Sequence, residues 1–329
     1  SSALLFIIPV AVWLLEKSDS YAAFIPVVLM FLLFGTAIFF PVLKLLWIGS
    51  FLNQNNMGIQ KIDDILYMDE IDEPALSRYP EDAHVEFRNV SFAYNTTTIL
   101  KEVSFTANPG TITALVGPSG AGKSTIAMLA ARFWDIQDGE ILIGNVPIKE
   151  IPTSVLMDNI ALVFQDNMLF FDTIEENIRM GNKTATFEDV KRAACAAQCH
   201  EFIEALPDGY QTLVGEGGTY LSGGEMQRLA LARAILKDAP VILLDEATAF
   251  ADPENEGKIL EAFSHLIKGK TVLVIAHRLG TITNADHILY LDKGMITEKG
   301  THEELLALHG AYAHMWKTYN RAKEWIIDR

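Results

Sequence analysis

Apolar residues are not spread evenly: two uninterrupted apolar stretches open the chain. Residues 3–15 are wholly apolar, and the 23 residues from 21 to 43 contain no charge. A bilayer crossing needs about 20 residues, so the second stretch is long enough for a tilted transmembrane helix. Residues 3–15 are too few for a full span, and we interpret them as the outer end of a helix whose start is missing. A signal peptide is the weaker interpretation, because no basic segment precedes them.

The pattern changes beyond residue 44. Apolar positions recur among polar ones over residues 51–67, which indicates that the same helix leaves the membrane and becomes amphipathic. Residues 69–83 are polar and contain proline, as a linker does. A buried core helix does not explain residues 21–43, because they lack any polar face. We therefore expect three parts: residues 1–68 with two membrane helices and a cytoplasmic extension, a linker over 69–83, and a globular domain over 84–329.

The globular part begins with patterns typical of strands. Residues 84–94 alternate between apolar and polar positions, and residues 99–106 and 111–116 follow as further strands. A glycine-rich segment and a helical pattern come directly after the third strand. Residues 241–244 are four aliphatic side chains, as in a buried strand. This order of strands and helices predicts an α/β domain.

Net charge is confined to the part of the chain after residue 50. Residues 1–50 carry two acidic and two basic side chains, so the rest holds 42 − 2 = 40 acidic and 26 − 2 = 24 basic residues, which gives the net charge of −16. Nucleic-acid binding relies on clustered Lys and Arg, so this balance argues against a nucleic-acid partner.

The two cysteines, Cys195 and Cys199, are four residues apart and share one face of a predicted helix. Together with His200 they offer too few ligands for a protein metal site. We expect free thiols in a reducing compartment.

Residues 117–124 read Gly-Pro-Ser-Gly-Ala-Gly-Lys-Ser, the pattern of a phosphate-binding loop. Its glycines let backbone N–H groups close on phosphates, and the helix that follows adds its positive N-terminal end. Lys123 is expected to bridge the β- and γ-phosphates, and Ser124 to bind Mg²⁺. The predicted nucleotide-binding residues of this segment are Gly117, Pro118, Ser119, Gly120, Ala121, Gly122, Lys123, Ser124 and Thr125.

Two adjacent carboxylates, Asp245 and Glu246, follow the aliphatic strand. A carboxylate at a strand end can hold Mg²⁺ directly or through water, which is the expected role of Asp245. Glu246 comes one residue later and is expected to orient and deprotonate the attacking water. In a chain with a phosphate-binding loop, this pair predicts nucleotide hydrolysis.

The segment Leu221-Ser222-Gly223-Gly224-Glu225 resembles the signature of ATP-binding cassette transporters, and the resemblance covers the whole chain. In that family the signature caps the γ-phosphate held by the opposite subunit. This implies nucleotide contacts for Ser222, Gly223, Gly224 and Glu225. The resemblance also implies three roles outside the signature. Tyr94 would stack on adenine, His277 would contact the γ-phosphate as a catalytic switch, and Gln165 would take part in Mg²⁺ binding and in coupling to the membrane domain.

A membrane part followed by a cassette on one chain resembles the exporter-type half-transporter, with helices similar to the fifth and sixth of six. It implies an α-helical membrane segment joined to an α/β P-loop NTPase domain with a mixed sheet core, a helical subdomain and an antiparallel β subdomain. The implied cofactors are ATP and Mg²⁺. The implied partners are the lipid bilayer and a second half-transporter subunit, with a heterodimer favoured over a homodimer. The implied location is the plasma or inner membrane, crossed several times, with the ATP-binding domain in the cytoplasm.

Two positions depart from the family pattern. Glu225 stands where the signature usually has Gln, which adds an acid near the nucleotide. The loop after the catalytic Glu usually reads Ser-Ala-Leu-Asp, whereas residues 249–252 read Ala-Phe-Ala-Asp. Phe250 is bulkier than the usual Ala, which favours a dedicated partner shaped to receive it.

The resemblance implies that ATP binding and hydrolysis in a cassette dimer drive solute translocation, but two directions stay open. Exporter architecture implies efflux of a lipid, drug or peptide. Residues 246–256 are instead similar to a branch that imports iron–siderophore complexes. The alternative of another class is a membrane-anchored cassette ATPase without transport, such as those of DNA repair or translation. The acidic charge and the continuous helix into the linker argue against it.

Overall fold

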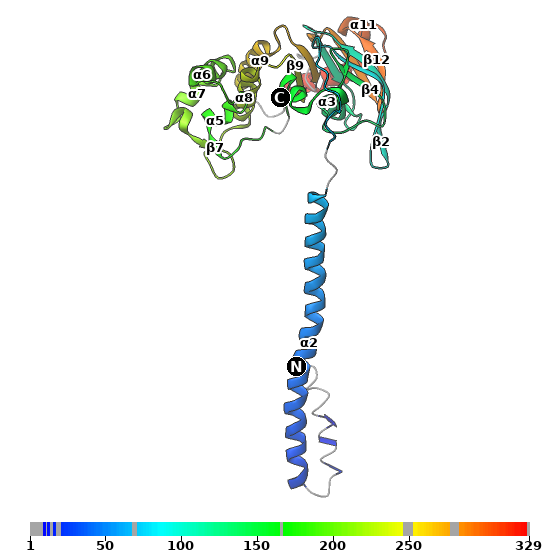
Figure 1. Cartoon of the computed structure of the whole chain (residues 1–329), viewed down its shortest axis with the longest axis vertical. Helices are drawn as coiled ribbons and strands as arrows, with labels where there is room; N and C mark the ends of the chain where they lie inside the picture. Colours follow the sequence, from blue (N-terminus) through cyan, green and yellow to red (C-terminus); the bar gives the residue numbers. More distant parts are fainter. Residues whose placement is uncertain are drawn as a thin grey trace. The chain divides into compact units, whose positions relative to one another are not determined.

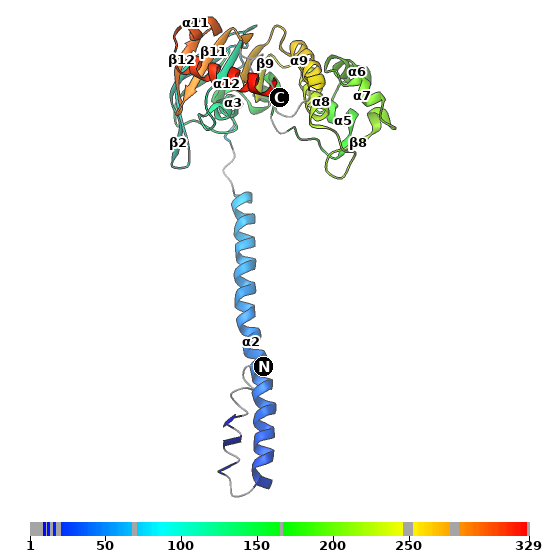
Figure 2. The same cartoon turned by 180° about the vertical axis from the view of Figure 1, so that it is seen from behind.

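A computed structural model of the chain describes residues 9–10, 12–13, 16–17, 21–67, 71–164, 167–245, 253–276 and 283–327. The chain divides into two compact units, Ser1–Glu70 and Ile71–Arg329, and each is described by itself (Figures 1 and 2).

The first unit is dominated by a single helix, α2 (Tyr21–Leu66), of 46 residues. It includes both the apolar stretch 21–43 and most of the amphipathic segment 51–67, so the expected continuity of these two segments is confirmed. Large apolar side chains are exposed along its length, among them Val27, Leu29, Leu33, Phe34, Trp47, Phe51, Ile59, Ile62, Ile65 and Leu66.

Among the residues that the structure describes, no helix combines the length and the apolar character needed to cross a membrane. The membrane crossing over residues 21–43 therefore stays a prediction.

The second unit contains a six-stranded sheet in the order β12-β11-β3-β10-β9-β6. In this sheet β3, β6, β9, β10 and β11 run parallel to one another, and β12 pairs with β11 in the antiparallel direction. The strands are β3 (Ile112–Val116), β6 (Ile160–Val163), β9 (Val241–Asp245), β10 (Thr271–Ile275), β11 (His287–Asp292) and β12 (Met295–Gly300).

A second, antiparallel sheet has the order β2-β1-β4-β5. It consists of β1 (Val85–Tyr94), β2 (Thr97–Ala107), β4 (Asp138–Ile143) and β5 (Val146–Pro147). A two-residue turn joins β1 to β2, because Tyr94 pairs with Thr97. Asn95 opens this turn with a φ of 54°, the left-handed conformation that tight hairpins require and that Asn tolerates.

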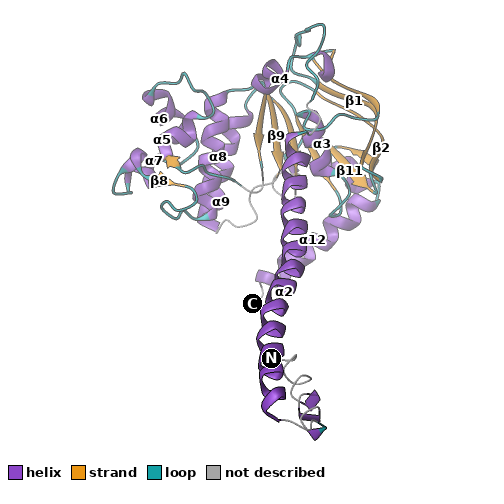
Figure 3. Cartoon of the chain, turned by 60° about the horizontal axis from the view of Figure 1, so that its bottom comes forward, coloured by secondary structure: helices purple, strands orange, loops and turns teal. Residues whose placement is uncertain are grey.

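Helices surround these sheets. They are α3 (Lys123–Ala130), α4 (Thr153–Asn159), α5 (Ile174–Arg179), α6 (Phe187–Ala196), α7 (His200–Glu204), α8 (Gly223–Lys237), α9 (Pro253–Ile267), α11 (His302–Ala307) and α12 (Ala311–Ile327), with 3₁₀ turns at Ile148–Glu150 and Gly209–Gln211. Helices α5 to α8 gather on one side of the sheets, together with the small sheet of β7 (Asp172–Thr173) and β8 (Leu213–Val214) (Figures 1 and 3).

The central strands β3, β9 and β10 are buried on both faces, and their side chains alternate between two cores. Ala114 and Val116 of β3 face a core that includes Leu229 and Ala232 of α8. Leu115, between them, faces the other core, which includes Ile126 and Leu129 of α3. Burial on both faces explains why β3, β9 and β10 consist mainly of aliphatic residues. The predicted α/β architecture of the globular domain is confirmed.

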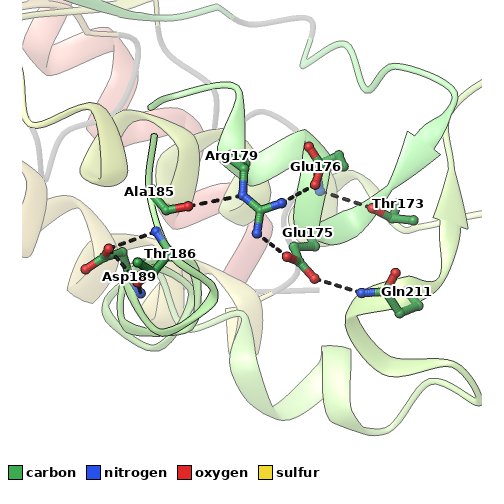
Figure 4. Close-up of polar contacts among 8 residues, drawn as sticks. All are labelled: Thr173, Glu175, Glu176, Arg179, Ala185, Thr186, Asp189 and Gln211. Atoms are coloured by element: carbon green, nitrogen blue, oxygen red, sulfur yellow. Dashed lines mark hydrogen bonds and ion pairs between the residues drawn. The ribbon is translucent and has the colours of Figure 1, made fainter. Parts of the chain in front are cut away.

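Polar contacts hold the helical group together around Arg179 at the end of α5 (Figure 4). Its guanidinium pairs with the carboxylates of Glu175 and Glu176, and its Nε donates to the carbonyl of Ala185. Glu175 also accepts a hydrogen bond of 2.7 Å from Nε2 of Gln211. These contacts connect α5 to the turns before α6 and β8.

Residues 71–83, most of the predicted linker, contact the globular domain. Arg132 donates to the carbonyl of Asp72 at 2.9 Å. Arg78 pairs with Glu150 at 2.8 Å. This segment therefore begins the second unit.

Candidate nucleotide-binding site

The phosphate-binding loop lies between β3 and α3, and its glycines adopt conformations that other residues avoid. Gly117, Gly120 and Gly122 have φ values of 140°, 78° and 100°. A Cβ on Gly117 would lie 2.1 Å from the carbonyl oxygen of Leu291, and one on Gly122 would lie 2.6 Å from Cδ2 of Leu100. The backbone conformation requires glycine at both positions, and at Gly117 the neighbouring backbone also leaves no space for a Cβ.

Lys123 is buried, with 6% of its surface exposed. Its Nζ donates to the carbonyl oxygens of Gly117 and Pro118 at 3.0 and 2.9 Å, so the ammonium group lies inside the curve of the loop. Burial lowers the pKa of Lys123, and the nearby negative charge of Asp245 partly opposes that shift. The loop thus holds a desolvated cation close to an acidic strand end, which suits binding of an anion chelated to a metal.

Helix α3 starts without a side-chain cap, since its N-cap residue is Gly122. By contrast, Thr173, Thr186 and Ser222 accept hydrogen bonds at the starts of α5, α6 and α8. The first N–H groups of a helix need partners from outside the helix, and a phosphate can supply them. The residues present therefore fit the phosphates of ATP.

Asp245 lies at the same sheet edge as this loop. Asp245 of β9 aligns with Ile275 of β10, which aligns with Leu115 of β3, so these parallel strands end together. Ser124 is exposed in the first turn of α3. A hydroxyl and a carboxylate are hard oxygen donors that fit Mg²⁺. No group of three or more His, Cys, Asp or Glu side chains in the described ranges could form a metal site without other ligands.

An aromatic pair stands at the end of β1. Tyr94 meets Trp134 edge to face, with ring centroids 5.3 Å apart, and its hydroxyl donates to Sδ of Met128 at 3.8 Å. Trp134 is 48% exposed. Sequence reasoning found Tyr94 and missed Trp134, although the tryptophan follows α3 by only a few residues. Together the two rings can form an apolar platform for a planar base.

The signature residues form the start of α8. Ser222 is its N-cap, and Ser222 and Glu225 form a reciprocal capping box. The backbone N–H of Ser222 and its hydroxyl each donate to Oε2 of Glu225 at 2.8 Å. The N–H of Glu225 donates back to Oγ of Ser222 at 3.3 Å. The spacing of Ser and Glu is the one that capping boxes show.

The signature helix and the phosphate-loop helix cover opposite faces of the central sheet. Helix α8 contributes to one buried core and α3 to the other. In three views β9 lies between the two helices (Figures 1, 2 and 3). The structure therefore does not bring the two predicted nucleotide-binding segments of one chain together.

Three predicted catalytic residues, Gln165, Glu246 and His277, lie outside the described residues, as do residues 249–252. The described strands end shortly before each of the three: β6 at Val163, β9 at Asp245 and β10 at Ile275. Because these strands are parallel neighbours, their ends share one sheet edge.

A buried polar hub, which sequence reasoning also missed, joins α5 to α8. Asn177 is 1% exposed. Its amide group bonds to both the N–H and the carbonyl of Phe170 at 2.9 Å and donates to the carbonyl of Thr173 at 3.0 Å. Nε of Arg233 on α8 donates to the backbone carbonyl of Asn177 at 2.9 Å. The hub fixes the loop that presents Phe170 and Phe171, which are 51% and 62% exposed.

A comparison with known protein families matches residues 100–249 to the family described as ABC transporter. Residues 100–249 of the chain belong to the ABC transporter family. The match covers the phosphate-binding loop, the signature and the strand that ends at Asp245, and it lies within the α/β domain of the second unit.

Known ABC proteins are similar over most of this chain. An ATP-dependent lipid A-core flippase of Desulfotalea psychrophila is 44% identical over 275 residues, which are 83% of this chain and 48% of the flippase. The mycobactin import ATP-binding/permease protein IrtA of Mycobacterium tuberculosis is 50% identical over 237 residues, 72% of this chain and 28% of that protein. The structure of a bacterial Atm1-family ABC exporter with ATP bound is 36% identical, with a TM-score of 0.74 over 96% of this chain and 56% of that one.

This chain thus spans about half the length of the flippase and less of IrtA.

Proposed function

We propose that this chain is the ATP-hydrolysing subunit of an ABC transporter, in which ATP binding and hydrolysis drive solute movement across a membrane. The observation that carries the proposal is the buried ammonium group of Lys123 inside the glycine loop, beside an uncapped α3 and near Asp245. This arrangement provides a cation, backbone donors and a metal-binding carboxylate at one sheet edge.

In the proposed reaction, water attacks the γ-phosphorus of ATP and the bond to the β–γ bridging oxygen breaks, which yields ADP and phosphate. Lys123 would leave the two loop carbonyls and bind the β- and γ-phosphates. Ser124, Asp245 and Gln165 would hold Mg²⁺, which offsets phosphate charge when bound. Glu246 would accept the proton of the attacking water, and His277 would contact the γ-phosphate.

We propose that each nucleotide site is shared between two subunits. The support is the placement of α8 and α3 on opposite faces of one sheet, because the signature then needs a phosphate-binding loop from another copy or another subunit. A second half-transporter subunit is the proposed partner. Phe250 in place of the usual small residue favours a dedicated partner over self-pairing.

We propose that residues 1–68 are the end of a membrane domain, followed by a linker over 69–83 and the ATP-binding domain over 84–329. The row of exposed apolar side chains on α2 supports this, since such side chains need lipid or neighbouring helices as partners. The exporter with ATP bound is similar over 96% of the chain, including this helix. The proposed location is the plasma or inner membrane, with the ATP-binding domain in the cytoplasm.

The transported solute is either exported or imported, and one relative supports each direction. The similar flippase is named for lipid A-core, and similar IrtA for mycobactin import. Export of a lipid, drug or peptide follows from the exporter-type architecture. Import of a ferric siderophore is the second candidate, favoured by the likeness of residues 246–256 to that branch. Uptake of labelled ferric siderophore by cells that lack this gene, with and without iron, distinguishes the two.

The test of the proposed function is ATP-dependent flux in vesicles that contain the full chain and its partner. We expect Mg²⁺-dependent hydrolysis that Lys123→Ala abolishes, together with accumulation of solute on one side. Hydrolysis without flux of any lipid, drug, peptide or siderophore would instead favour a membrane-anchored cassette ATPase. Stimulation by nucleic acid would support that alternative further.

A further inference from the structure

A carboxylate lies at the start of α8, where the proposed function requires the γ-phosphate of ATP to bind. Glu225 is the acidic residue in the first turn of this 15-residue helix. One of its oxygens, Oε2, accepts hydrogen bonds from both the N–H and the hydroxyl of Ser222 at 2.8 Å. The positive end of the helix is therefore already compensated by a negative charge from the same chain.

The two donors of Ser222 are in use. A serine hydroxyl has one hydrogen to donate, and here it goes to Glu225. The backbone N–H of Ser222 goes to the same carboxylate oxygen. To bind Ser222, a phosphate oxygen must replace Glu225 as the acceptor of these two hydrogen bonds. It then lies next to the negative charge of the Glu225 carboxylate. Two unit charges in contact repel enough to change an affinity by about fivefold even in the high dielectric of water.

We propose that Glu225 sets the ATP affinity of the shared site, because its carboxylate competes with the γ-phosphate of the partner-bound nucleotide for Ser222. This inference rests on the proposed function, in which the signature of one subunit closes on nucleotide held by the other. A glutamine would keep the capping box, since its amide oxygen accepts the same bonds, but it would carry no charge. Glu225 thus makes closure depend on a higher ATP concentration.

The chain offers a matched control at α11. Thr301 and Glu304 form a capping box with the same geometry: the N–H of Thr301 donates to Oε2 of Glu304 at 2.8 Å, and the N–H of Glu304 donates to Oγ1 of Thr301 at 3.3 Å. Glu304→Gln therefore removes the same charge from the same kind of cap, at a helix for which no nucleotide contact is proposed.

The experiment measures ATPase rate against ATP concentration for the full chain together with its partner subunit in lipid nanodiscs, with this chain as wild type, Glu225→Gln or Glu304→Gln. We expect the half-maximal ATP concentration to fall by at least about fivefold in Glu225→Gln and to stay unchanged in Glu304→Gln. The difference in half-maximal ATP concentration between wild type and Glu225→Gln should become smaller in about 1 M salt, where charges are screened within about 3 Å. Glu225→Ala, which removes the charge together with the cap, should also lower the half-maximal concentration.

Equal half-maximal concentrations in wild type and both Glu225 variants would overturn the proposal. An equal fall in Glu304→Gln would also overturn it, because the effect would then follow net charge alone. Wild type without any ATPase activity would contradict the proposed function itself and remove the basis of this inference. The two failures are distinguishable, since wild-type turnover reports on the function and the Glu225 shift reports on the competition.

Discussion

The polar hub at Asn177 allows a quantitative prediction of local stability. Asn177→Ala removes a side chain that is 1% exposed and that bonds to the N–H and carbonyl of Phe170 and to the carbonyl of Thr173. A buried polar group left without its partner costs about 1–3 kcal/mol. Phe170 alone loses two such bonds, so we expect the loop over residues 168–173 to lose about 2–6 kcal/mol of local stability.

Hydrogen exchange of the backbone amides, followed by mass spectrometry on the full chain, measures this loss directly. Since about 1.4 kcal/mol is a factor of ten, amides over residues 168–180 should exchange at least about 30-fold and at most about 20,000-fold faster in Asn177→Ala. ATP affinity should not change, because the phosphate-binding loop lies on another element.

Asn182→Ala is the matched control. Asn182 is exposed, and its side chain accepts hydrogen bonds from the N–H and hydroxyl of Thr184 only a turn away. Its removal should cost less than about 0.5 kcal/mol, as most surface substitutions do. Wild-type protection of residues 168–180 in Asn177→Ala would refute the reasoning, and so would an equal loss of protection in Asn182→Ala.

Three further predictions concern the nucleotide site, and equilibrium ATP binding measures each. Lys123→Ala should weaken binding because it deletes the cation that faces the phosphates, and unchanged affinity would mean that this loop is not the phosphate site. If the Trp134 ring stacks on the base, Trp134→Ala should cost about 1–3 kcal/mol of ATP affinity. Phe133→Ala, at the neighbouring residue, should have no effect. Equal effects of the two substitutions on ATP affinity would argue against a platform at Trp134. Gly122→Ala should abolish ATP binding, because its Cβ would meet an apolar side chain at 2.6 Å. Gly110 is also at positive φ but has open space around it, so Gly110→Ala should leave ATP affinity intact. Loss of ATP binding in both variants would point to general unfolding.

The sequence alone predicts the local parts of this site well. The phosphate-binding loop is one continuous segment, so its motif specifies both the left-handed glycines and the start of α3. The same holds for Asp245, because an aliphatic run that ends in acids predicts a buried strand with its carboxylate at the sheet edge. The capping box at α8 could also have been read from Ser222 and Glu225, which have the spacing of that motif.

The parts that sequence reasoning missed arise from tertiary contacts. Trp134 meets Tyr94 only because the antiparallel sheet places the end of β1 beside the chain that leaves α3. Asn177 and Arg233 are 56 residues apart and meet because α5 packs against α8. No local pattern signals either pair, since a half-exposed tryptophan and a buried asparagine are both ordinary residues in their own segments.

The measurement that tests the central claim most directly uses this chain and its partner subunit with different tags, purified as pairs that carry both tags. In the first pair, one copy is this chain with Ser222→Arg, and the other copy is the partner with Gln in place of its own catalytic Glu, the change that Glu246→Gln makes in this chain. If the signature acts on the nucleotide of the opposite subunit, this pair keeps one intact shared site and hydrolyses ATP. A pair with both changes on one copy and none on the other should then be inactive, because each site has lost a residue. The reverse result, an inactive first pair and an active second pair, would show that each chain completes its own site and would contradict the account.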